Sequence, residues 1–71
     1  TWLQAGAFGS REGAESLARD LQQAGLVPVA VFDVDGLYRV RLGPYDSQNE
    51  VESVVRRAIE LGFERPHTVK R

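Results

Sequence analysis

The sequence lacks cysteine, contains a single histidine, and has no excess of charge of either sign. Without cysteine, disulfide bridges and thiolate metal sites are excluded, although the absence does not decide the compartment, because oxidising compartments permit disulfides without requiring them. Nine basic and ten acidic residues give a formal net charge of −1, so no global field attracts nucleic acid or an anionic membrane. No apolar run is long enough to span a bilayer. We therefore expect neither a metal site, nor a cofactor, nor direct insertion into a membrane.

The length and composition predict one small folded domain covering residues 1–71. With 71 residues, of which 42% are hydrophobic, the chain can form a core of modest size. No signal peptide is visible, and a strand-like run begins at once. We expect a domain taken from a longer protein, with any targeting segment outside this chain.

The two halves of the chain resemble each other, which indicates an internal repeat. The residues that match under one constant shift include Gln4 with Arg41, Ser10 with Ser47, Arg19 with Arg56, and Gly25 with Gly62. The shift holds over most of both halves. We therefore expect two strand–helix–strand units, at about residues 1–34 and 35–71.

The first unit shows the signals of a strand, a helix and a second strand. Residues 2–5 alternate as a half-buried strand does, and the glycines of residues 6–9 predict a break. Ser10 is placed to cap a helix whose apolar residues recur at helical spacing. Gly25 suits the left-handed residue that ends a helix, and the β-branched run 27–32 predicts the second strand.

The second unit begins with a turn. Asp35-Gly36 predicts a hairpin that leads into the strand at residues 37–42. Ser47 and Glu50 form a capping box at the start of the second helix, Gly62 ends it, and residues 67–70 form a short last strand. The buried stripe of this helix is expected to contain Val51, Val54, Val55, Ala58 and Ile59.

Two such units joined by a hairpin predict an α+β fold of order βαββαβ. Right-handed crossovers place both helices on one face of a four-stranded antiparallel sheet. This arrangement is the ferredoxin-like, or RNP-like, fold. The other face of the sheet has nothing in the sequence to cover it, which antiparallel sheets tolerate.

Alternation along the strands predicts which side chains line the open face. In the third strand, Tyr38, Val40 and Leu42 face the helices. The repeat then sends Leu3 and Ala5 to the core. The side chains expected on the open face are Trp2, Gln4, Leu37, Arg39 and Arg41. His67 and Val69 share a face of the last strand, but pattern alone leaves the registers of the second and fourth strands open.

Ordinary explanations exist for these residues, and catalysis finds no support. Exposed arginines are usually solvated, a lone histidine such as His67 is usually a surface residue, and Trp2 could merely shield the sheet. The serines lie at caps and within helices, while Asp33 and Asp35 flank a turn, where aspartate is common. The glycines near residue 6 lack the lysine of a phosphate-binding loop. We expect a domain that is not an enzyme.

Two motifs resemble those of a known family. The run LQAGAF at residues 3–8 is similar to the opening "VQxGSF" motif of SPOR domains, and GLYRVRLGPY at residues 36–45 is similar to their second hallmark, "glYRVrvGPf". The resemblance implies a βαββαβ domain of the bacterial periplasm or envelope. It also implies binding to peptidoglycan glycan strands that lack stem peptides, at the division septum. The parent would be a septal protein or a lytic transglycosylase of the rare lipoprotein A type.

The resemblance also implies a binding site on the open face, formed mainly by Gln4 and Arg39. Ala7 stands where the motif has serine, and Leu37 stands at a position that is sometimes aromatic. His67 matches a last-strand position, which turns it outward. The full set of expected glycan-binding residues is Trp2, Gln4, Ala7, Leu37, Arg39, Arg41, His67 and Val69.

Two other functions stay open from the sequence. A βαββαβ domain with aromatic and arginine side chains on its open face also describes modules that bind single-stranded nucleic acid. Those modules need stacking aromatics on the central strands, where here only Trp2 qualifies. A regulatory or protein-interaction module is the second alternative. Nothing in the pattern indicates a further apolar face, so we expect a monomer. Because the central strands lack stacking aromatics and the net charge is −1, we expect no binding to nucleic acid.

Overall fold

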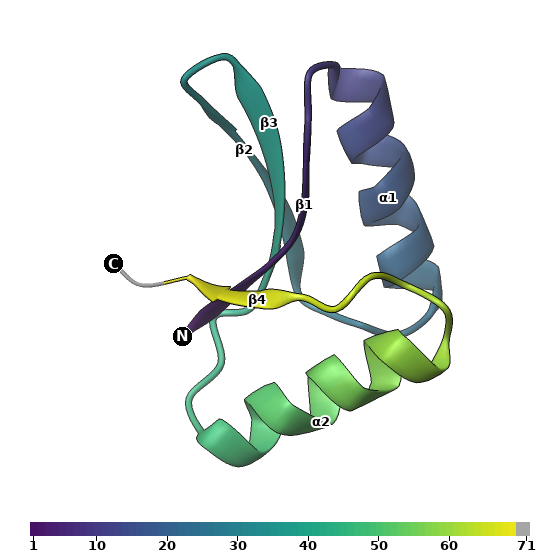
Figure 1. Cartoon of the computed structure of the whole chain (residues 1–71), viewed down its shortest axis with the longest axis vertical. Helices are drawn as coiled ribbons and strands as arrows, with labels where there is room; N and C mark the ends of the chain where they lie inside the picture. Colours follow the sequence, from purple (N-terminus) through teal and green to yellow (C-terminus); the bar gives the residue numbers. More distant parts are fainter. Residues whose placement is uncertain (70–71) are drawn as a thin grey trace.

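The computed structural model describes residues 1–69 and shows one four-stranded sheet with two helices (Figure 1). The elements are β1 (Trp2–Phe8), α1 (Arg11–Gln23), β2 (Val29–Val34), β3 (Leu37–Leu42), α2 (Gln48–Glu60) and β4 (His67–Val69). The strand order is β2-β3-β1-β4, and all neighbours are antiparallel. The predicted α+β fold of order βαββαβ is confirmed.

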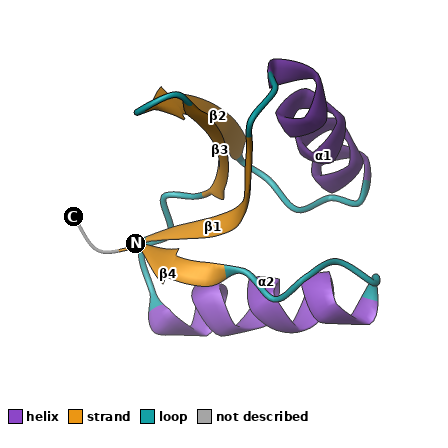
Figure 2. Cartoon of the chain, turned by 45° about the horizontal axis from the view of Figure 1, so that its top comes forward, coloured by secondary structure: helices purple, strands orange, loops and turns teal. Residues whose placement is uncertain are grey.

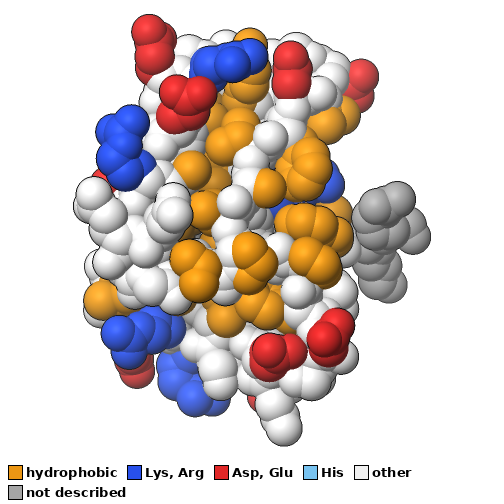
Figure 3. Space-filling model, turned by 180° about the vertical axis from the view of Figure 1, so that it is seen from behind, with side chains coloured by type: hydrophobic (Ala, Val, Ile, Leu, Met, Phe, Trp, Pro, Cys, Tyr) orange, Lys and Arg blue, Asp and Glu red, His pale blue; other side chains and the backbone are white. Residues whose placement is uncertain are grey.

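Both helices lie on the same side of the curled sheet, α1 beside the upper part of β1 and α2 along β4 (Figure 2). The core fills the space between sheet and helices. Its largest fully buried side chains are Leu3, Leu21, Val40 and Leu42. Seen from behind, hydrophobic side chains form a band down the molecule, with charged side chains at its two ends (Figure 3). No helix within residues 1–69 is long and apolar enough to cross a membrane.

The helices begin and end at the predicted signals. The Ser10 hydroxyl accepts a hydrogen bond from the Gly13 N–H at 3.2 Å, and the Ser47 hydroxyl accepts one from the Glu50 N–H at the same distance. These bonds satisfy donors that the first turn leaves free. The Glu50 carboxylate reaches back to the N–H of Asp46 rather than to that of the capping residue. Gly25, after α1, has the positive φ of 84° that was expected.

The hairpin between β2 and β3 has the two-residue turn that Asp35-Gly36 predicts. Both residues have positive φ, 54° and 79°, as a turn matched to the twist of the strands requires. The pairing then runs regularly away from the turn and places Phe32 opposite Arg39. Strand β3 has the predicted bounds. Strand β2 covers Val29–Val34 instead of the predicted 27–32, because it pairs with β3 from Val34 opposite Leu37 to Val29 opposite Leu42.

The predicted break at residues 6–9 is wrong, because β1 continues through Gly6 to Phe8. The pairing with β3 shifts between Gln4 and Gly6, so Ala5 is the extra residue of a β-bulge. A Cβ on Gly6 would come within 3.1 Å of the Leu17 and Phe8 side chains. Glycine is therefore used here because side chains pack directly against the backbone, and not because the strand ends.

Helix α2 is buried along a narrower stripe than predicted. Val51 and Ala58 are buried, and Val54 and Val55 pack against the core, but Ile59 is 46% exposed. The expectation for Ile59 is wrong because a groove separates this side of α2 from β4. The predicted last strand is found as His67–Val69, and Lys70, which was also expected in it, lies outside the described residues.

Candidate functional site

The sheet face opposite the helices carries side chains from all four strands. Residues paired across antiparallel strands point to the same side, so the register defines this face. It includes Trp2, Gln4 and Ala7 from β1, Ala30, Phe32 and Val34 from β2, Leu37, Arg39 and Arg41 from β3, and His67 and Val69 from β4. We call this set the open face. It extends across three strand spacings, or about 14 Å.

Gln4 and Arg39 meet on this face from neighbouring strands. The Arg39 Nη1 donates a long hydrogen bond to the Gln4 Oε1 at 3.5 Å, and both side chains are partly buried. Among residues 1–69, no other hydrogen bond involves the Arg39 guanidinium or the Gln4 side-chain amide. Their remaining N–H groups can donate to a ligand. The pair can therefore bind a carboxylate or a hydroxyl group from the solvent side.

An aromatic cluster lies beside this pair. The rings of Trp2 and Phe32 meet edge to face, with centroids 5.5 Å apart and planes at 87°. The Arg41 guanidinium lies over the Phe32 ring, 5.4 Å from its centroid. Because β3 lies between β1 and β2, these three side chains bridge three adjacent strands. The cluster combines apolar ring surface with a positive charge.

Arg41 also has an unsatisfied donor. Its Nε atom is buried and has no hydrogen-bond partner among residues 1–69. Buried polar groups in proteins are nearly always paired, so an exception needs an explanation. A ligand acceptor reaching into the aromatic cluster would supply the missing partner.

The bulge in β1 decides where Ala7 lies. Strict alternation from Gln4 would send Gly6 outward and Ala7 inward. After the extra residue the order reverses, so that Gly6 lies opposite Val40 and Ala7 lies opposite Arg39. Ala7 is exposed on the open face, next to the guanidinium.

The other predicted residues are also placed by the register. Leu37, 38% exposed, lies at the turn end of β3, two residues from Arg39 on the same face. His67 lies opposite Gln4, and Val69 lies opposite Trp2. The structure thus brings Trp2, Gln4, Ala7, Leu37, Arg39, Arg41, His67 and Val69 onto one surface, as the sequence analysis expected.

Phe32 is the member of this surface that sequence reasoning missed. It was assigned to the second strand without a register. The signal was nevertheless present, because a two-residue Asp35-Gly36 turn pairs Val34 with Leu37 and hence Phe32 with Arg39. Since Arg39 was expected to face outward, Phe32 had to face outward as well.

The two faces of β3 carry different side chains. Tyr38, the other aromatic of β3, packs against the core on the helix side, where the Arg11 guanidinium lies 5.6 Å from its ring centroid. No group of three or more histidine, aspartate or glutamate side chains that could hold a metal ion occurs in the described part of the chain. The fold and the face together define a small binding domain of the βαββαβ class.

Comparison with known proteins identifies the family. A model of the SPOR domain matches residues 1–64, and the chain belongs to the SPOR domain family. It is similar to the crystal structure of the RlpA SPOR domain from Pseudomonas aeruginosa, with a TM-score of 0.89 and 32% identity over 99% of this chain and 97% of that one. No curated protein sequence matches the chain. Membership in this family of binding domains supports a peptidoglycan-binding module of the cell envelope that is not itself catalytic.

Proposed function

We propose that the domain recognises peptidoglycan glycan strands that lack stem peptides, and that it directs its parent protein to the division septum. The observation that carries the proposal is the Gln4–Arg39 contact beside the Trp2–Phe32 ring pair on the uncovered sheet face. A guanidinium next to aromatic surface matches a sugar polymer that carries carboxylates.

The chemistry of a stripped strand fits these side chains. Removing the stem peptide leaves each N-acetylmuramic acid with a free lactyl carboxylate. Arg39 can pair with it, in bidentate fashion where two donors are available. Gln4 can donate to and accept from the sugar hydroxyl and acetamide groups. A ring of Trp2 offers flat apolar surface to the face of a sugar.

Selection against peptide-bearing strands follows from the same contacts. With the stem peptide attached, the lactyl carboxylate becomes an amide, so the charge pair with Arg39 is lost. The peptide also adds bulk above the sheet. Specificity for stripped strands then arises from a lost attraction together with a steric clash.

A sedimentation assay with purified peptidoglycan sacculi tests the proposal. Wild-type domain should bind amidase-treated sacculi more strongly than intact ones, and Gln4→Ala/Arg39→Ala should weaken that binding about tenfold or more, since hydrogen bonds to charged groups contribute about 1.5–3 kcal/mol. Arg19→Ala/Gln22→Ala is the matched control, because it removes the same two side-chain types from exposed positions of α1. The control should bind as wild type does.

The outcomes separate the possible functions. Equal binding to both preparations would leave a peptidoglycan binder without preference for stripped strands. Binding to neither, together with salt-dependent binding to a generic single-stranded RNA, would favour the nucleic-acid alternative. Septal targeting is tested by a fluorescent fusion in dividing cells, where the double variant should lose septal fluorescence and the control should keep it.

A further inference from the structure

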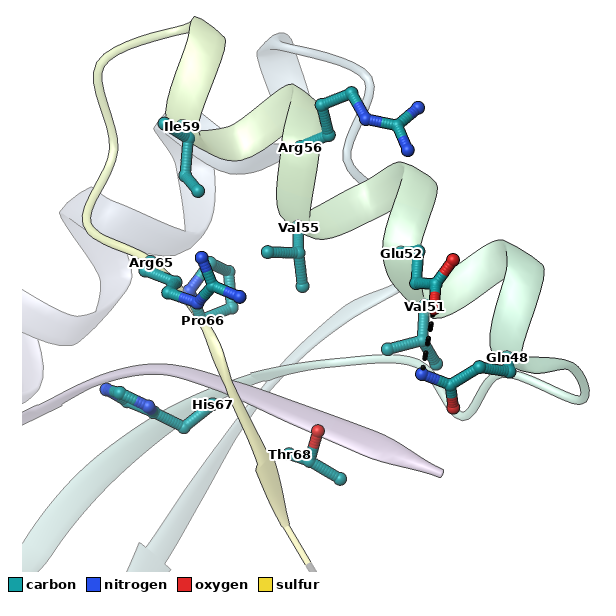
Figure 4. Close-up of a pocket in the computed structure, with 10 residues that line it drawn as sticks. All are labelled: Gln48, Val51, Glu52, Val55, Arg56, Ile59, Arg65, Pro66, His67 and Thr68. Atoms are coloured by element: carbon teal, nitrogen blue, oxygen red, sulfur yellow. Dashed lines mark hydrogen bonds between the residues drawn. The ribbon is translucent and has the colours of Figure 1, made fainter.

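A second surface is a groove between α2 and β4, which meets the open face at His67. The groove has a volume of about 650 Å³, within the range of sites that bind small ligands. Its lining residues are Val51, Val55 and Ile59 from α2, Arg65 and Pro66 from the chain leading into β4, and His67 and Thr68 from β4. Figure 4 shows these side chains facing one another across the space. Ile59 is 46% exposed there.

The strand beside this groove has a free edge. Among residues 1–69, β4 is the last strand of the sheet and pairs with β1 alone, through His67, Thr68 and Val69. An edge strand presents unpaired N–H and C=O groups to a segment that can pair with it. Extended peptides commonly bind in this way, with main-chain bonds to the strand and side chains in neighbouring pockets.

The spacing of the helix suits an extended occupant. Val51, Val55 and Ile59 are four residues apart, which corresponds to about 6 Å along the helix axis. Alternate side chains of a strand are about 6.6 Å apart. β4 and α2 run alongside each other in Figures 1 and 2, so a strand added to β4 would direct alternate side chains at successive residues of this row.

The charge of the groove indicates one further property of the occupant. Arg56 and Arg65 line it, whereas Glu52 is its single acidic residue and already accepts a hydrogen bond from the Gln48 side chain at 3.4 Å. In Figure 4 the Arg65 side chain lies over Pro66, on the side of the groove that Val55 faces. A net positive groove on a chain with a net charge of −1 favours an acidic partner.

We propose that this groove binds an extended segment of a partner protein, which adds a strand to β4, places aliphatic side chains at alternate positions against Val55 and Ile59, and pairs a carboxylate with Arg65. The site is separate from the Gln4–Arg39 pair. It would let the domain bind a protein partner while its open face is occupied by glycan.

A labelled synthetic peptide tests this proposal by fluorescence anisotropy. The probe has seven residues, with valine at the second and fourth positions, glutamate at the sixth, threonine elsewhere, and blocked ends. Wild-type domain should bind it saturably. Ile59→Asp should weaken binding about tenfold by removing apolar contact, and Arg65→Gln about fivefold, the effect of an exposed ion pair. Replacing the probe's glutamate with glutamine should reproduce the Arg65→Gln loss.

Two control substitutions lie at the C-terminal end of α2, close to Ile59 in the sequence. Leu61 is exposed to the same extent as Ile59, 46%, but does not line the groove, and Arg57 is an exposed arginine that does not line it either. Leu61→Asp and Arg57→Gln should therefore change the affinity less than twofold. In nuclear magnetic resonance spectra the probe should shift the backbone amides of residues 67–69 and of α2.

Failure of this proposal can be told apart from failure of the glycan proposal. Gln4→Ala/Arg39→Ala should still bind the peptide, and Ile59→Asp should still sediment with amidase-treated sacculi. The groove proposal is overturned if the probe does not bind at millimolar concentration, if Ile59→Asp binds it as wild type does, or if stripped glycan displaces the bound probe.

Discussion

Replacing Phe32 with leucine should destabilise the fold and weaken glycan binding, although Phe32 lies outside the hydrophobic core. Its ring makes the edge-to-face contact with Trp2 at 5.5 Å and lies under the Arg41 guanidinium at 5.4 Å. Leucine retains most of the apolar area but can make neither contact. The substitution therefore isolates the aromatic contribution to the open face.

The magnitude follows from the two contacts. An aromatic pair contributes about 0.5–1.5 kcal/mol beyond its buried area, and a cation–π contact at a partly exposed site about 0.5–1 kcal/mol. Phe32→Leu should therefore lower the free energy of unfolding by about 1–2.5 kcal/mol. For a domain of this size the midpoint of thermal unfolding should fall by roughly 4–20 °C. The variant should still fold, because a domain of this length has a stability of roughly 4–10 kcal/mol.

A double-mutant cycle measures the ring contact directly. Urea unfolding is followed by circular dichroism for wild type, Trp2→Leu, Phe32→Leu and the double variant. The coupling between the two substitutions should be about 0.5–1.5 kcal/mol. Phe63→Leu provides the control, because Phe63 packs against the core, away from the open face, and should show no coupling to Trp2→Leu.

The result that would refute this reasoning is additivity. A Trp2–Phe32 coupling below about 0.3 kcal/mol would mean that the rings do not interact in solution. Trp2 would then lie on the open face without the support of Phe32. Since Trp2 is the single tryptophan of the chain, its fluorescence on adding stripped glycan gives a second reading of the same surface.

Three further predictions concern the loop and cap that support β1 and α2. Gly43→Ala should cost about 1–3 kcal/mol of stability, measured by urea unfolding, because φ is 121° and the new Cβ would lie 2.9 Å from the Thr1 carbonyl oxygen. Ser47→Ala should lower the free energy of unfolding by about 1 kcal/mol, because it removes the acceptor for the Glu50 N–H. Ser47→Asp should retain most of that stability, because its carboxylate can accept the same bond. Burial, and secondarily the charge of Glu50, raises the pKa of Tyr45 above its usual value of 10.0. The unfolded chain loses this proton first, so stability should fall as the pH rises above about 10, and Tyr45→Phe should reduce that fall.

The sequence predicted most reliably the elements whose pattern is unbroken. Strand β3 has the predicted bounds because its alternation is regular and the Asp35-Gly36 turn precedes it directly. Both helix starts were predicted because Ser10 and Ser47 supply the hydroxyl acceptors that the first turns need. These are local effects, so they are readable from a few neighbouring residues.

The errors arose where tertiary contacts override a local pattern. Gly6 was interpreted as a break because glycine is unfavourable in strands, but it lies inside β1, where a Cβ would come within 3.1 Å of the Leu17 and Phe8 side chains. Ile59 was assigned to the buried stripe because its spacing is helical, but β4 does not close against that side of α2. Neither contact can be derived from the residues near it in sequence.

The pairing of the sheet positions both proposed surfaces. The bulge at Ala5 reverses the alternation of β1, and only this reversal brings Ala7 next to Arg39 on the open face. β4 is the last strand in the sheet order, so among residues 1–69 no strand pairs with its outer edge, and the groove at Ile59 lies between β4 and α2. Prediction from alternation assumes that the two-residue period of a strand is unbroken. A bulge breaks that period and changes which side chains share a face. Regular alternation therefore places Gln4, Arg39 and Arg41 on the open face, and the break in that alternation adds Ala7 to it.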